Sequence, residues 1–296
     1  MTAGAPHDSP VLLLGAAGFL GQHVAATLRA AGRSVREVRG VDLAGLDDRA
    51  WDDLMAGTAG VVNAAGRTAG TLSDLTRANV LLLAGALDAA AHAGVPLVHL
   101  ASAAEYGRTP DGHAAREDGL ATPLSAYGAS KLAGTLLLQQ AVHGGHVRAC
   151  ALRVTNPLGH GMGAGTLPGR AAQQVLAAGT APLRFGPLGA QRDFVDARDV
   201  ARAAVHVLDL LGAGHTVPDV INVGSGEARP VRDVVHGLAA LAGHRGPLLE
   251  DAPGSPRSGD VPYQRADLTR LHATGFTAQH TFDSSVMALL GPVPAH

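Results

Sequence analysis

The sequence predicts an α/β fold, a doubly wound parallel sheet with a smaller C-terminal lobe for substrate. Two observations lead to this prediction. Short apolar runs alternate with Ala- and Leu-rich helical stretches along most of the chain, and a glycine-rich turn follows the first apolar run at once. Strands that are joined by helices pair in parallel through right-handed crossovers, which places helices on both faces of the sheet.

The strands are expected where the apolar runs fall, at residues 11–15, 34–38, 60–66, 96–102, 147–154 and 219–224. Helical patterns separate them: one over 22–32 closes on Gly32, a residue suited to the end of a helix, and another covers 197–211. Glycine and proline become frequent after about residue 155, which indicates a segment that leaves the sheet. We therefore assign a dinucleotide-binding domain to residues 1–155 and 197–224, and a substrate-binding lobe to residues 156–196 and 225–296.

The bulk composition excludes several classes of function. Lys and Arg number 23 and Asp and Glu 25, a formal charge of −2, so no global positive field attracts nucleic acid or an anionic membrane. The 15 histidines are scattered, without H-E-x-x-H or paired C-x-x-C spacing, so we expect no metal. The single cysteine, Cys150, excludes a disulfide within the chain and indicates a reducing compartment; in the apolar run VRACALRV we expect a buried, inert thiol.

The N-terminal residues carry no basic region, and the first apolar run is too short and too interrupted by glycine for a signal peptide or a spanning helix. The apolar stretch at residues 80–101 is broken by Asp88, His92 and Pro96. We therefore expect a soluble, cytoplasmic protein.

The stretch VLLLGAAGFLGQH places Gly15, Gly18 and Gly21 directly after the first strand and into the first helix. Glycines at these positions permit a tight turn, let the backbone approach a pyrophosphate, and let the helix pack on the strand. The amides and the positive dipole end of the helix favour phosphate. We therefore predict a Rossmann-like dinucleotide site; the alternative is a glycine-rich turn without a ligand. No G-x-x-x-x-G-K-[ST] sequence is present, which excludes a P-loop.

The residue after the second strand bears on the choice of cofactor. An acid usually stands there and holds the adenosine ribose hydroxyls, but this chain has Arg39 followed by Gly40. A guanidinium attracts the 2′-phosphate that a carboxylate would repel. The sequence therefore favours NADP(H), with NAD(H) possible and a solvent-exposed arginine without a ligand as the alternative. Asp42 and Leu43 follow closely and are expected to border the adenine.

The stretch SAYGASK places Tyr127 and Lys131 four residues apart, on one face of a helix. Lys131 is the only lysine in the chain. A tyrosine and a lysine at this spacing are either a proton-transfer pair or two ordinary surface residues on one helical turn, and the spacing alone leaves both open.

The order of motifs along nearly the whole chain resembles the extended short-chain dehydrogenase/reductase family, the NAD-dependent epimerase/dehydratase group. The motifs that carry the resemblance are GAAGFLG, VVNAAG, RANV, LASAAEYG, PLSAYGASK, LRVTNPLG, RDFVDARDVARA, VINVGSGE and RSGDVPYQRADLTRL. The resemblance implies that Ser102, Tyr127 and Lys131 are catalytic, and Asn79 matches a family asparagine. The further cofactor contacts that it implies are Phe19 and Leu20 of the glycine loop, Ala64, Ala65 and Gly66 beside the cofactor riboses, and Tyr127 and Lys131 themselves.

The chemistry explains why a tyrosine and a lysine are needed. A free phenol has a pKa near 10, which is too high for ready proton exchange at neutral pH. The ammonium of Lys131 and the oxidised nicotinamide both favour the phenolate of Tyr127 and are expected to lower its pKa. The resemblance implies that Ser102 hydrogen-bonds the substrate oxygen and that Lys131 also reaches the nicotinamide ribose.

Departures from the family pattern narrow the reaction. Related dehydratases carry an Asp-Glu pair directly after the catalytic Ser or Thr, whereas this chain has Ala103 and Ala104, so 4,6-dehydration is not expected. Strand alternation should place the next residue, Glu105, on another face, and we interpret it as structural. Thr135 stands where relatives often have Glu, which changes no catalytic assignment.

The residues expected to contact substrate favour a nucleotide-activated sugar over a small free alcohol. Arg192 and Arg257 match positions that clamp the diphosphate in sugar-nucleotide relatives, a role suited to bidentate guanidinium contacts. Alternatively, the two arginines are ion-paired with Asp193 and Asp260. The remaining substrate-side contacts that the resemblance implies are Ser102, Ala103 and Asn156.

The phrase NAAGRTAG and the ending EYG most resemble nucleotide-hexose ketoreductases of deoxysugar biosynthesis. The predicted function is therefore NAD(P)H-dependent reduction of a keto group on a nucleotide-activated (deoxy)sugar, with Tyr127 as proton donor. Two alternatives remain: an NAD-dependent nucleotide-sugar epimerase, and a non-catalytic dinucleotide-binding regulator. The resemblance also implies a homodimer formed through the helices after Asn79 and Tyr127.

Overall fold

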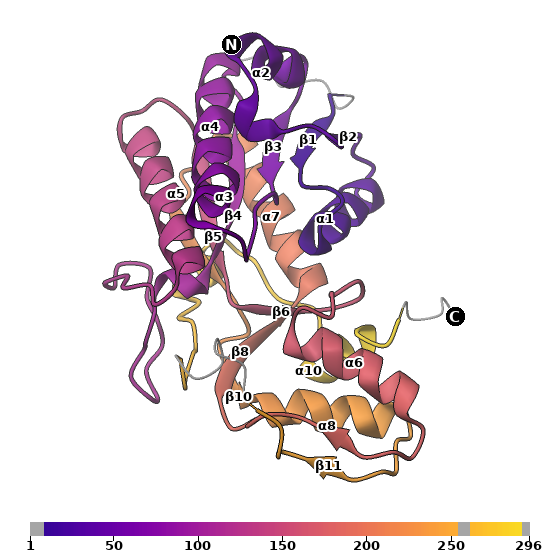
Figure 1. Cartoon of the computed structure of the whole chain (residues 1–296). Coiled ribbons are helices and arrows are strands. Elements are labelled where there is room, and N and C mark those ends of the chain that lie inside the picture. Colours follow the sequence, from indigo (N-terminus) through magenta and orange to yellow (C-terminus); the bar gives the residue numbers. More distant parts are fainter. Residues whose placement is uncertain (1–8, 254–260, 292–296) are drawn as a thin grey trace.

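The computed structural model describes residues 9–253 and 261–291, and a six-stranded parallel sheet forms its centre (Figure 1). From one edge to the other, the strands are β2 (Val35–Glu37), β1 (Val11–Leu14), β3 (Gly60–Asn63), β4 (Leu97–Ser102), β5 (Ala149–Val154) and β9 (Val220–Val223). Every neighbouring pair is parallel. The predicted fold class is confirmed, and each strand lies within the range that the apolar runs predicted.

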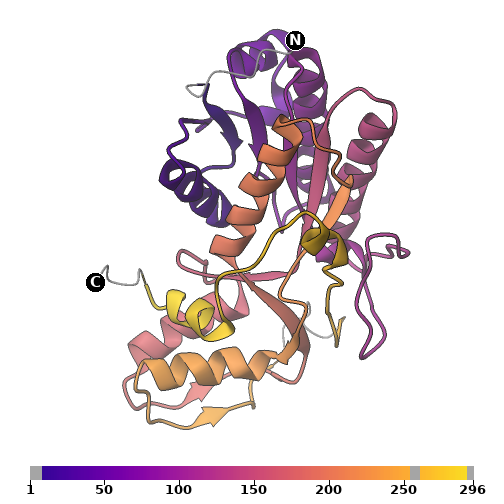
Figure 2. The same cartoon turned by 180° about the vertical axis from the view of Figure 1, so that it is seen from behind.

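Helices cover both faces of this sheet because its strands are apolar on both sides. In β1, Val11 and Leu13 face one core, and Leu12 and Leu14 face the other. The first layer contains α1 (Phe19–Ala30) and α7 (Ala197–Gly212), and the second contains α2 (Asp48–Met55), α4 (Leu82–Ala93) and α5 (Ala126–His143). Figures 1 and 2 show the two layers from opposite sides.

The two helices predicted from sequence patterns are present, with shifts at their ends. α1 starts at Phe19, inside the glycine-rich stretch rather than after it, with Gly18 as its N-cap. Gly32 follows the end of α1 with a left-handed φ of +71°, as predicted for a glycine that terminates a helix. α7 starts at Ala197, where the side chain of Asp196 accepts a hydrogen bond from the backbone N–H of Arg198 (2.8 Å).

The strand order creates a topological switch point between β1 and β3. From β1 the chain crosses to β2 on one side and then to β3 on the other, so the connections that leave the carboxyl ends of β1 and β3 diverge. In doubly wound sheets, ligands bind in the crevice that this divergence opens. The glycine-rich loop after β1 therefore lies where the topology predicts a ligand.

A smaller lobe lies beyond the carboxyl ends of the sheet (Figure 1). Its strands are β6 (Asn156–Leu158), β8 (Gln191–Asp196) and β10 (Ala228–Pro230) in one sheet, and β7 (Leu183–Arg184) and β11 (Leu248–Leu249) in another. Its helices are α6 (Leu167–Ala178), α8 (Val231–Leu241) and α10 (Phe282–Ala288). A core of its own, which includes Leu158, Phe194 and Leu238, holds these elements together.

Short turns complete the described chain. They are η1 (Leu43–Gly45), α3 (Leu72–Thr76), the π-helical turn η2 (Arg77–Leu81), the 3-10 turn η3 (Ala103–Glu105) and α9 (Thr269–Ala273). Leu271 of α9 and Phe276 after it join the core that faces α7. The assignment of residues 1–155 and 197–224 to a dinucleotide-binding domain, and of residues 156–196 and 225–296 to a substrate-binding lobe, stays a proposal.

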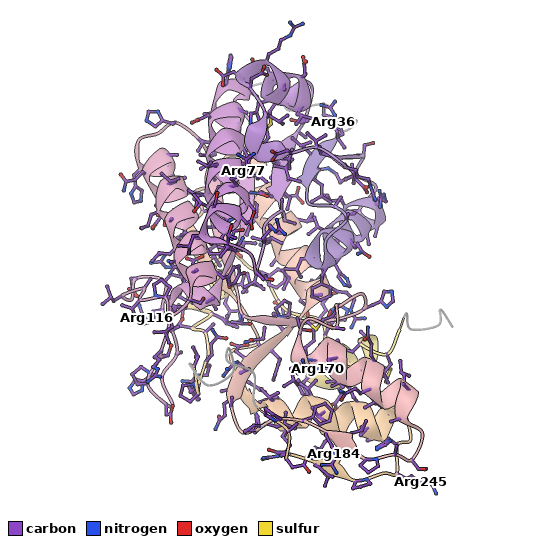
Figure 3. All side chains as sticks on the ribbon, viewed as in Figure 1. Arg36, Arg77, Arg116, Arg170, Arg184 and Arg245 are labelled. Carbon is purple, nitrogen blue, oxygen red and sulfur yellow. The ribbon has the colours of Figure 1, made fainter. Side chains whose placement is uncertain are left out.

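Several side chains that the composition singled out can now be placed. Cys150 is buried in β5, where desolvation raises the pKa of its thiol. Within residues 9–253 and 261–291, no three His, Cys, Asp or Glu side chains are grouped to hold a metal ion. In the same part of the chain, no helix is long and apolar enough to cross a lipid bilayer. The labelled arginines in Figure 3 are spread over both lobes.

Candidate active site

The glycine loop after β1 packs directly on the backbone that follows β3. Gly15 has a left-handed φ of +80°, and a Cβ on it would lie 2.5 Å from the backbone nitrogen of Ala65. A Cβ on Gly21 would lie 2.0 Å from the carbonyl oxygen of Gly15. Only glycine fits at these two positions. No side chain caps the N-terminus of α1, so the amides around Gly18, Phe19 and Leu20 are suited to a pyrophosphate.

The segment Ala64-Ala65-Gly66 forms the other wall of the crevice. The backbone N–H of Ala64 donates to the carbonyl of Leu14 (2.9 Å). A Cβ on Gly66 would lie 2.7 Å from Oδ1 of Asn79 and 3.3 Å from Nζ of Lys131. The tertiary fold therefore brings this segment against Lys131 from α5, and the residues present fit a dinucleotide that lies between the glycine loop and α5.

The carboxyl end of β2 differs from the sequence-based expectation, which found no acid there. Glu37 is the last residue of β2, and its carboxylate accepts hydrogen bonds from Nε and Nη2 of Arg39 (3.0 and 2.6 Å). Arg29 from α1 donates to the same carboxylate. These hydrogen bonds, with that of Arg39 the strongest, lower the pKa of Glu37. The acid expected at the end of β2 is therefore Glu37, two residues before Arg39. The side chain of Arg39 is mostly exposed and folds back onto Glu37.

Asp42 and Leu43 start the turn η1, which follows β2 in the chain. The carboxylate of Asp42 accepts a hydrogen bond from Arg77, which is labelled in Figure 3. Leu43 is buried in the core beneath α2 and α4. Their expected contact with the adenine stays a prediction.

The three residues expected to be catalytic come from two neighbouring elements. Ser102 is the last residue of β4 and caps the turn η3, with its Oγ accepting from the backbone N–H of Ala104 (3.1 Å). Tyr127 lies in the first turn of α5, and Lys131 lies one turn later. The hydroxyl of Ser102 interacts with the phenol of Tyr127 and favours its ionised form. Lys131 is almost completely buried, and its Nζ donates to the carbonyl of Leu100 (2.8 Å).

The protein groups alone do not lower the pKa of Tyr127, in contrast to the sequence-based expectation. Burial raises the pKa of the phenol, the Ser102 hydroxyl lowers it, and Glu105 raises it. Burial also lowers the pKa of Lys131 to about 8, while the charge of Glu105 acts against this change. The ammonium of Lys131 donates to the Leu100 carbonyl, and the expected depression of the phenol pKa by a bound nicotinamide stays a prediction.

Asn79 connects the crevice wall to the catalytic helix, a role that the sequence indicated only by its match to a family asparagine. It lies in the π-helical turn η2 and is almost completely buried. Its Oδ1 accepts from the backbone N–H of Arg67 (2.9 Å), and its Nδ2 donates to the Arg67 carbonyl (2.9 Å) and to Oγ of Ser130 (2.9 Å). Ser130 in turn donates to the carbonyl of Tyr127 (2.8 Å).

The residues after Ser102 form a 3-10 turn, so the argument from strand alternation does not apply to them. Ala104 lines the cleft beside Ser102, whereas Ala103, expected as a substrate contact, is buried against Tyr106. Glu105 is completely buried and turns away from the cleft lining. The 3-10 turn therefore decides that Ala104 faces the cleft while Ala103 and Glu105 do not.

A cleft of about 620 Å³ lies between the carboxyl ends of the sheet and the smaller lobe. This volume is in the range of small-molecule sites. From the sheet side, the lining includes Ser102, Ala104 and Tyr127; from the lobe side, it includes Asn156, Met162, Arg192, Phe194 and Gln264. The expected catalytic hydroxyls therefore face a cavity large enough for a sugar and part of its carrier.

Asn156 and Gln264 form a hydrogen-bonded pair in this cleft. Nδ2 of Asn156 donates to Oε1 of Gln264 (2.6 Å) and to the carbonyl of Asp193 (3.0 Å). Nε2 of Gln264 donates to the carbonyl of Ala103 (3.3 Å). The amide oxygen of Asn156 thus remains for a ligand. Sequence reasoning missed Gln264, which lies in a segment that folds back from far along the chain.

The two arginines expected to bind diphosphate have different outcomes. Arg192 lines the cleft, and burial lowers its pKa. Its suggested ion-pair partner, Asp193, instead accepts hydrogen bonds from the backbone N–H groups of Ser225, Gly226 and Ala266. Arg257 and Asp260 lie outside the described residues, so the assignment of Arg257 stays a prediction.

Comparison with known proteins identifies similar chains. The model of the NAD dependent epimerase/dehydratase family matches residues 11–224. The dTDP-6-deoxy-L-talose 4-dehydrogenase (NAD(P)(+)) of Kitasatospora kifunensis is 32% identical, and the alignment covers 96% of this chain and 96% of that protein.

Two solved structures are similar over nearly the whole chain. MoeE5 in complex with UDP-glucose and NAD has a TM-score of 0.82 and is 30% identical, with 95% of this chain and 97% of MoeE5 covered. RMD from Pseudomonas aeruginosa complexed with NADPH has a TM-score of 0.82 and is 25% identical, with 96% of each chain covered. One of these structures thus contains NAD and the other NADPH.

Asn79→Ala should weaken both the fold and the cofactor site. It leaves the Arg67 backbone groups without their partner, which costs about 2 kcal/mol of unfolding free energy, and it frees the crevice wall from α5. We expect the dissociation constant for NADPH to rise at least about fivefold, roughly 1 kcal/mol. Urea denaturation and fluorescence titration measure the two effects. Ser130→Ala, which keeps the Asn79–Arg67 pair, should have the smaller effect on NADPH, and the reverse order would contradict this role.

Proposed function

The chain belongs to the NAD dependent epimerase/dehydratase family, and from this membership we propose that it reduces a keto group on a nucleotide-activated 6-deoxysugar. It is an NAD(P)-dependent enzyme. The observation that carries the proposal is the composition of the cleft: Ser102 and Tyr127 line it, and no Asp or Glu belongs to its described lining. Such a cleft lacks the acid and base carboxyls that dehydration uses, so it favours oxidation or reduction of the sugar.

The similar proteins support this kind of substrate. The Kitasatospora relative is named for a dTDP-6-deoxysugar, and the MoeE5 structure contains UDP-glucose. The lobe side of the cleft is apolar at Leu158, Met162 and Phe194, and Arg192 supplies a guanidinium. A 6-deoxysugar presents a methyl group that an apolar wall accommodates, and its diphosphate is suited to a guanidinium partner.

In the proposed reaction, the hydroxyl of Ser102 donates a hydrogen bond to the ketone oxygen, and Tyr127 transfers its phenolic proton to that oxygen. Lys131 stabilises the phenolate that remains. When bound, the reduced nicotinamide supplies the hydride. Hydride at carbon and a proton at oxygen convert C=O into CH–OH, so the step balances without another reactant.

Tyr127→Phe should lower kcat for ketosugar reduction by about 10² to 10⁴, because phenylalanine has no proton to transfer. The affinity for NADPH should stay close to wild type, because the ring fills the same space. Consumption of NADPH with a panel of 4-ketosugar nucleotides measures the rate. Tyr263→Phe, a buried tyrosine outside the cleft lining, is the matched control. Full activity of Tyr127→Phe would disprove Tyr127 as the proton donor. A wild-type protein that binds NADPH but consumes it with none of these substrates would favour the non-catalytic regulator.

The epimerase alternative makes a different demand on the cofactor. An enzyme that oxidises and then re-reduces one substrate retains its NAD, so its denatured form releases stoichiometric NAD. A reductase exchanges its cofactor at every turnover and is purified largely without it. Stoichiometric NAD together with no consumption of NADPH would replace the reductase by the epimerase.

We propose NADP(H) as the preferred cofactor, with NAD(H) also accepted. Arg29 and Arg39 both donate to Glu37, so two positive charges surround one negative charge at the end of β2. A 2′-phosphate can bind to these guanidiniums, and Glu37 offers an acceptor to the ribose hydroxyls of NAD(H). The name of the Kitasatospora relative and the two cofactors in the similar structures agree with dual use.

Arg39→Gln should raise the dissociation constant for NADPH about tenfold, roughly 1.4 kcal/mol, and change that for NADH by less than about threefold. Only NADPH carries the phosphate that the guanidinium contacts. Fluorescence titration of the purified protein measures both constants. Arg33→Gln is the matched control, because Arg33 is paired with Asp209 (2.7 Å). Equal losses for both cofactors, or no loss for either, would remove the argument from Arg39.

We propose a homodimer formed through η2, α4 and α5. Leu81 of η2 and Leu137 of α5 are about half exposed, at 48% and 42%, and these elements pack side by side along one edge of the molecule (Figure 1). Large apolar side chains that are exposed on adjacent helices indicate a surface for association. Neither Leu81 nor Leu137 belongs to the lining of the cleft.

Leu137→Glu should shift the protein from dimer to monomer, because an unpaired carboxylate would be buried in the interface. Sedimentation velocity over a range of concentrations measures the association. Leu176→Glu changes a more exposed leucine on α6, in the other lobe, and should leave the mass unchanged. A wild-type protein that stays monomeric, or a Leu137→Glu variant that stays dimeric, would disprove this interface.

A further inference from the structure

A buried carboxylate lies directly behind the residues proposed to be catalytic. Glu105 is completely inaccessible to solvent and does not line the cleft. Its Oε1 accepts from the backbone N–H of Ser102 (3.1 Å) and from Oγ1 of Thr135 (3.0 Å), and its Oε2 accepts from Nε of Arg153 (2.8 Å). Glu105 therefore touches the machinery from the protein side, and it can affect the reaction only through its neighbours.

The carboxylate of Glu105 is paired with a buried guanidinium. An isolated buried carboxylate would bind a proton, because burial without a partner disfavours the charge. Arg153, on the neighbouring strand β5, is itself 3% exposed and supplies the counter-charge. The guanidinium of Arg153 also lies 4.6 Å from the ring centre of Tyr106, which fixes it in place. The pair thus buries one negative and one positive charge side by side.

Charged and titratable groups from several elements surround this carboxylate. Lys131 and Tyr127 come from α5, Arg153 from β5, and Tyr106 follows η3. His99, from β4, is buried, and burial, together with the charge of Lys131, lowers its pKa well below the usual value. Among these groups, Glu105 is the anion that acts on both Lys131 and Tyr127, raising the pKa of each.

We propose that Glu105 is a positioning residue for the reduction: its buried charge keeps Lys131 as an ammonium and Tyr127 as a protonated phenol, while its oxygen fixes the backbone of Ser102. This inference deepens the proposed function and rests on it. The hydrogen bond to Thr135 adds a geometric consequence. Because Oγ1 of Thr135 lies 3.0 Å from Oε1 of Glu105, a carboxylate on residue 135 can reach the same place from α5.

The sign of the effect follows from charge alone. Replacing the carboxylate by an amide removes a negative charge near two groups, so the ammonium of Lys131 and the phenol of Tyr127 both lose their protons at lower pH. Reduction needs both groups protonated. Deprotonation of either group lowers the rate of reduction at high pH. In the variant, both groups lose their protons at lower pH, so the decrease in rate also moves to lower pH.

Glu105→Gln removes the charge and keeps an oxygen that can accept from Ser102, while its amide N–H group replaces the oxygen that accepts from Arg153. The chain has 3 tyrosines, so the near-ultraviolet difference titration of each protein against its Tyr127→Phe counterpart reports the ionisation of Tyr127 alone. We expect the pKa of Tyr127 to fall by about one unit or more. The kinetic profile should agree: the high-pH fall of kcat moves by a similar amount, while the low-pH plateau of kcat and the KM for the ketosugar nucleotide stay within about threefold.

A merely structural role predicts a different pattern. In that case Glu105→Gln lowers the melting temperature but leaves the titration of Tyr127 and the high-pH fall of kcat unchanged, and this result would overturn the proposal. Asp199→Asn is the matched control, because Asp199 is another buried acid, 2% exposed and paired with Arg202 (2.6 Å), outside the site. It should lower stability without moving the ionisation of Tyr127.

Two further variants keep the proposal testable if Glu105→Gln does not fold. Exchange of the two side chains, Glu105→Thr with Thr135→Glu, returns a carboxylate to the same place and should restore the wild-type pH profile. The neutral pair, Glu105→Gln with Arg153→Gln, leaves no unpaired buried charge and should still shift Tyr127 to lower pKa. A wild-type profile in the neutral pair, or no restoration in a folded exchange variant, would contradict the proposal.

The titration of Tyr127 needs no substrate, so the two proposals fail separately. A wild-type protein that reduces no ketosugar nucleotide disproves the proposed function, whereas the titration still decides whether Glu105 controls the phenol. An active enzyme whose Tyr127 titrates identically with and without the carboxylate disproves only the role of Glu105.

Discussion

Two loops approach each other more closely than side chains would permit, and the rest of the site depends on this contact. The turn at Gly15 packs against the backbone of Ala65, where an added Cβ would stand 2.5 Å from the nearest nitrogen. Gly21 packs against the same turn, so the N-terminus of α1 lies at the switch point of the sheet. Gly66, at the end of the second loop, lies against Asn79 and Lys131. A single close approach thus sets the spacing between the phosphate loop and the catalytic helix.

The electrostatics of the site follow from burying a lysine. Desolvation lowers the pKa of Lys131 to about 8, so its charge depends on nearby partners rather than on water. The Leu100 carbonyl accepts from the ammonium, and the carboxylate of Glu105 supports it from behind. Arginine keeps its charge when buried and has a planar, wider head group. A compact ammonium whose pKa responds to its surroundings explains why a lysine stands here in a chain otherwise rich in arginine.

The cleft depends on a second buried acid, Asp193, which joins the two lobes. It is completely buried, and its carboxylate accepts backbone hydrogen bonds from residues after β9 and before α9. The backbone carbonyl of Asp193 accepts a hydrogen bond from Asn156, and Asn156 also donates to Gln264. The substrate side of the site is therefore assembled from segments that are distant in the chain. The carboxylate of Asp193 is turned toward these backbone groups and away from the cleft. Among the described residues, no Asp or Glu lines the cleft.

The sequence by itself determined the sheet, the glycine loop and the placement of Tyr127 and Lys131 one turn apart on one helix. These features are local: alternating apolar runs specify strands and helices, glycines mark the turn, and residues four apart share a helix face. Tertiary structure decided the rest. Arg39 folded back onto Glu37, two residues before it, where β2 ends. Ala103 turned into the protein because a 3-10 turn follows Ser102 in place of a strand, and Gln264 reached the cleft from a segment far along the chain. The sequence contained Glu105, Thr135 and Arg153, but only the packing of η3, α5 and β5 brought them within hydrogen-bond distance.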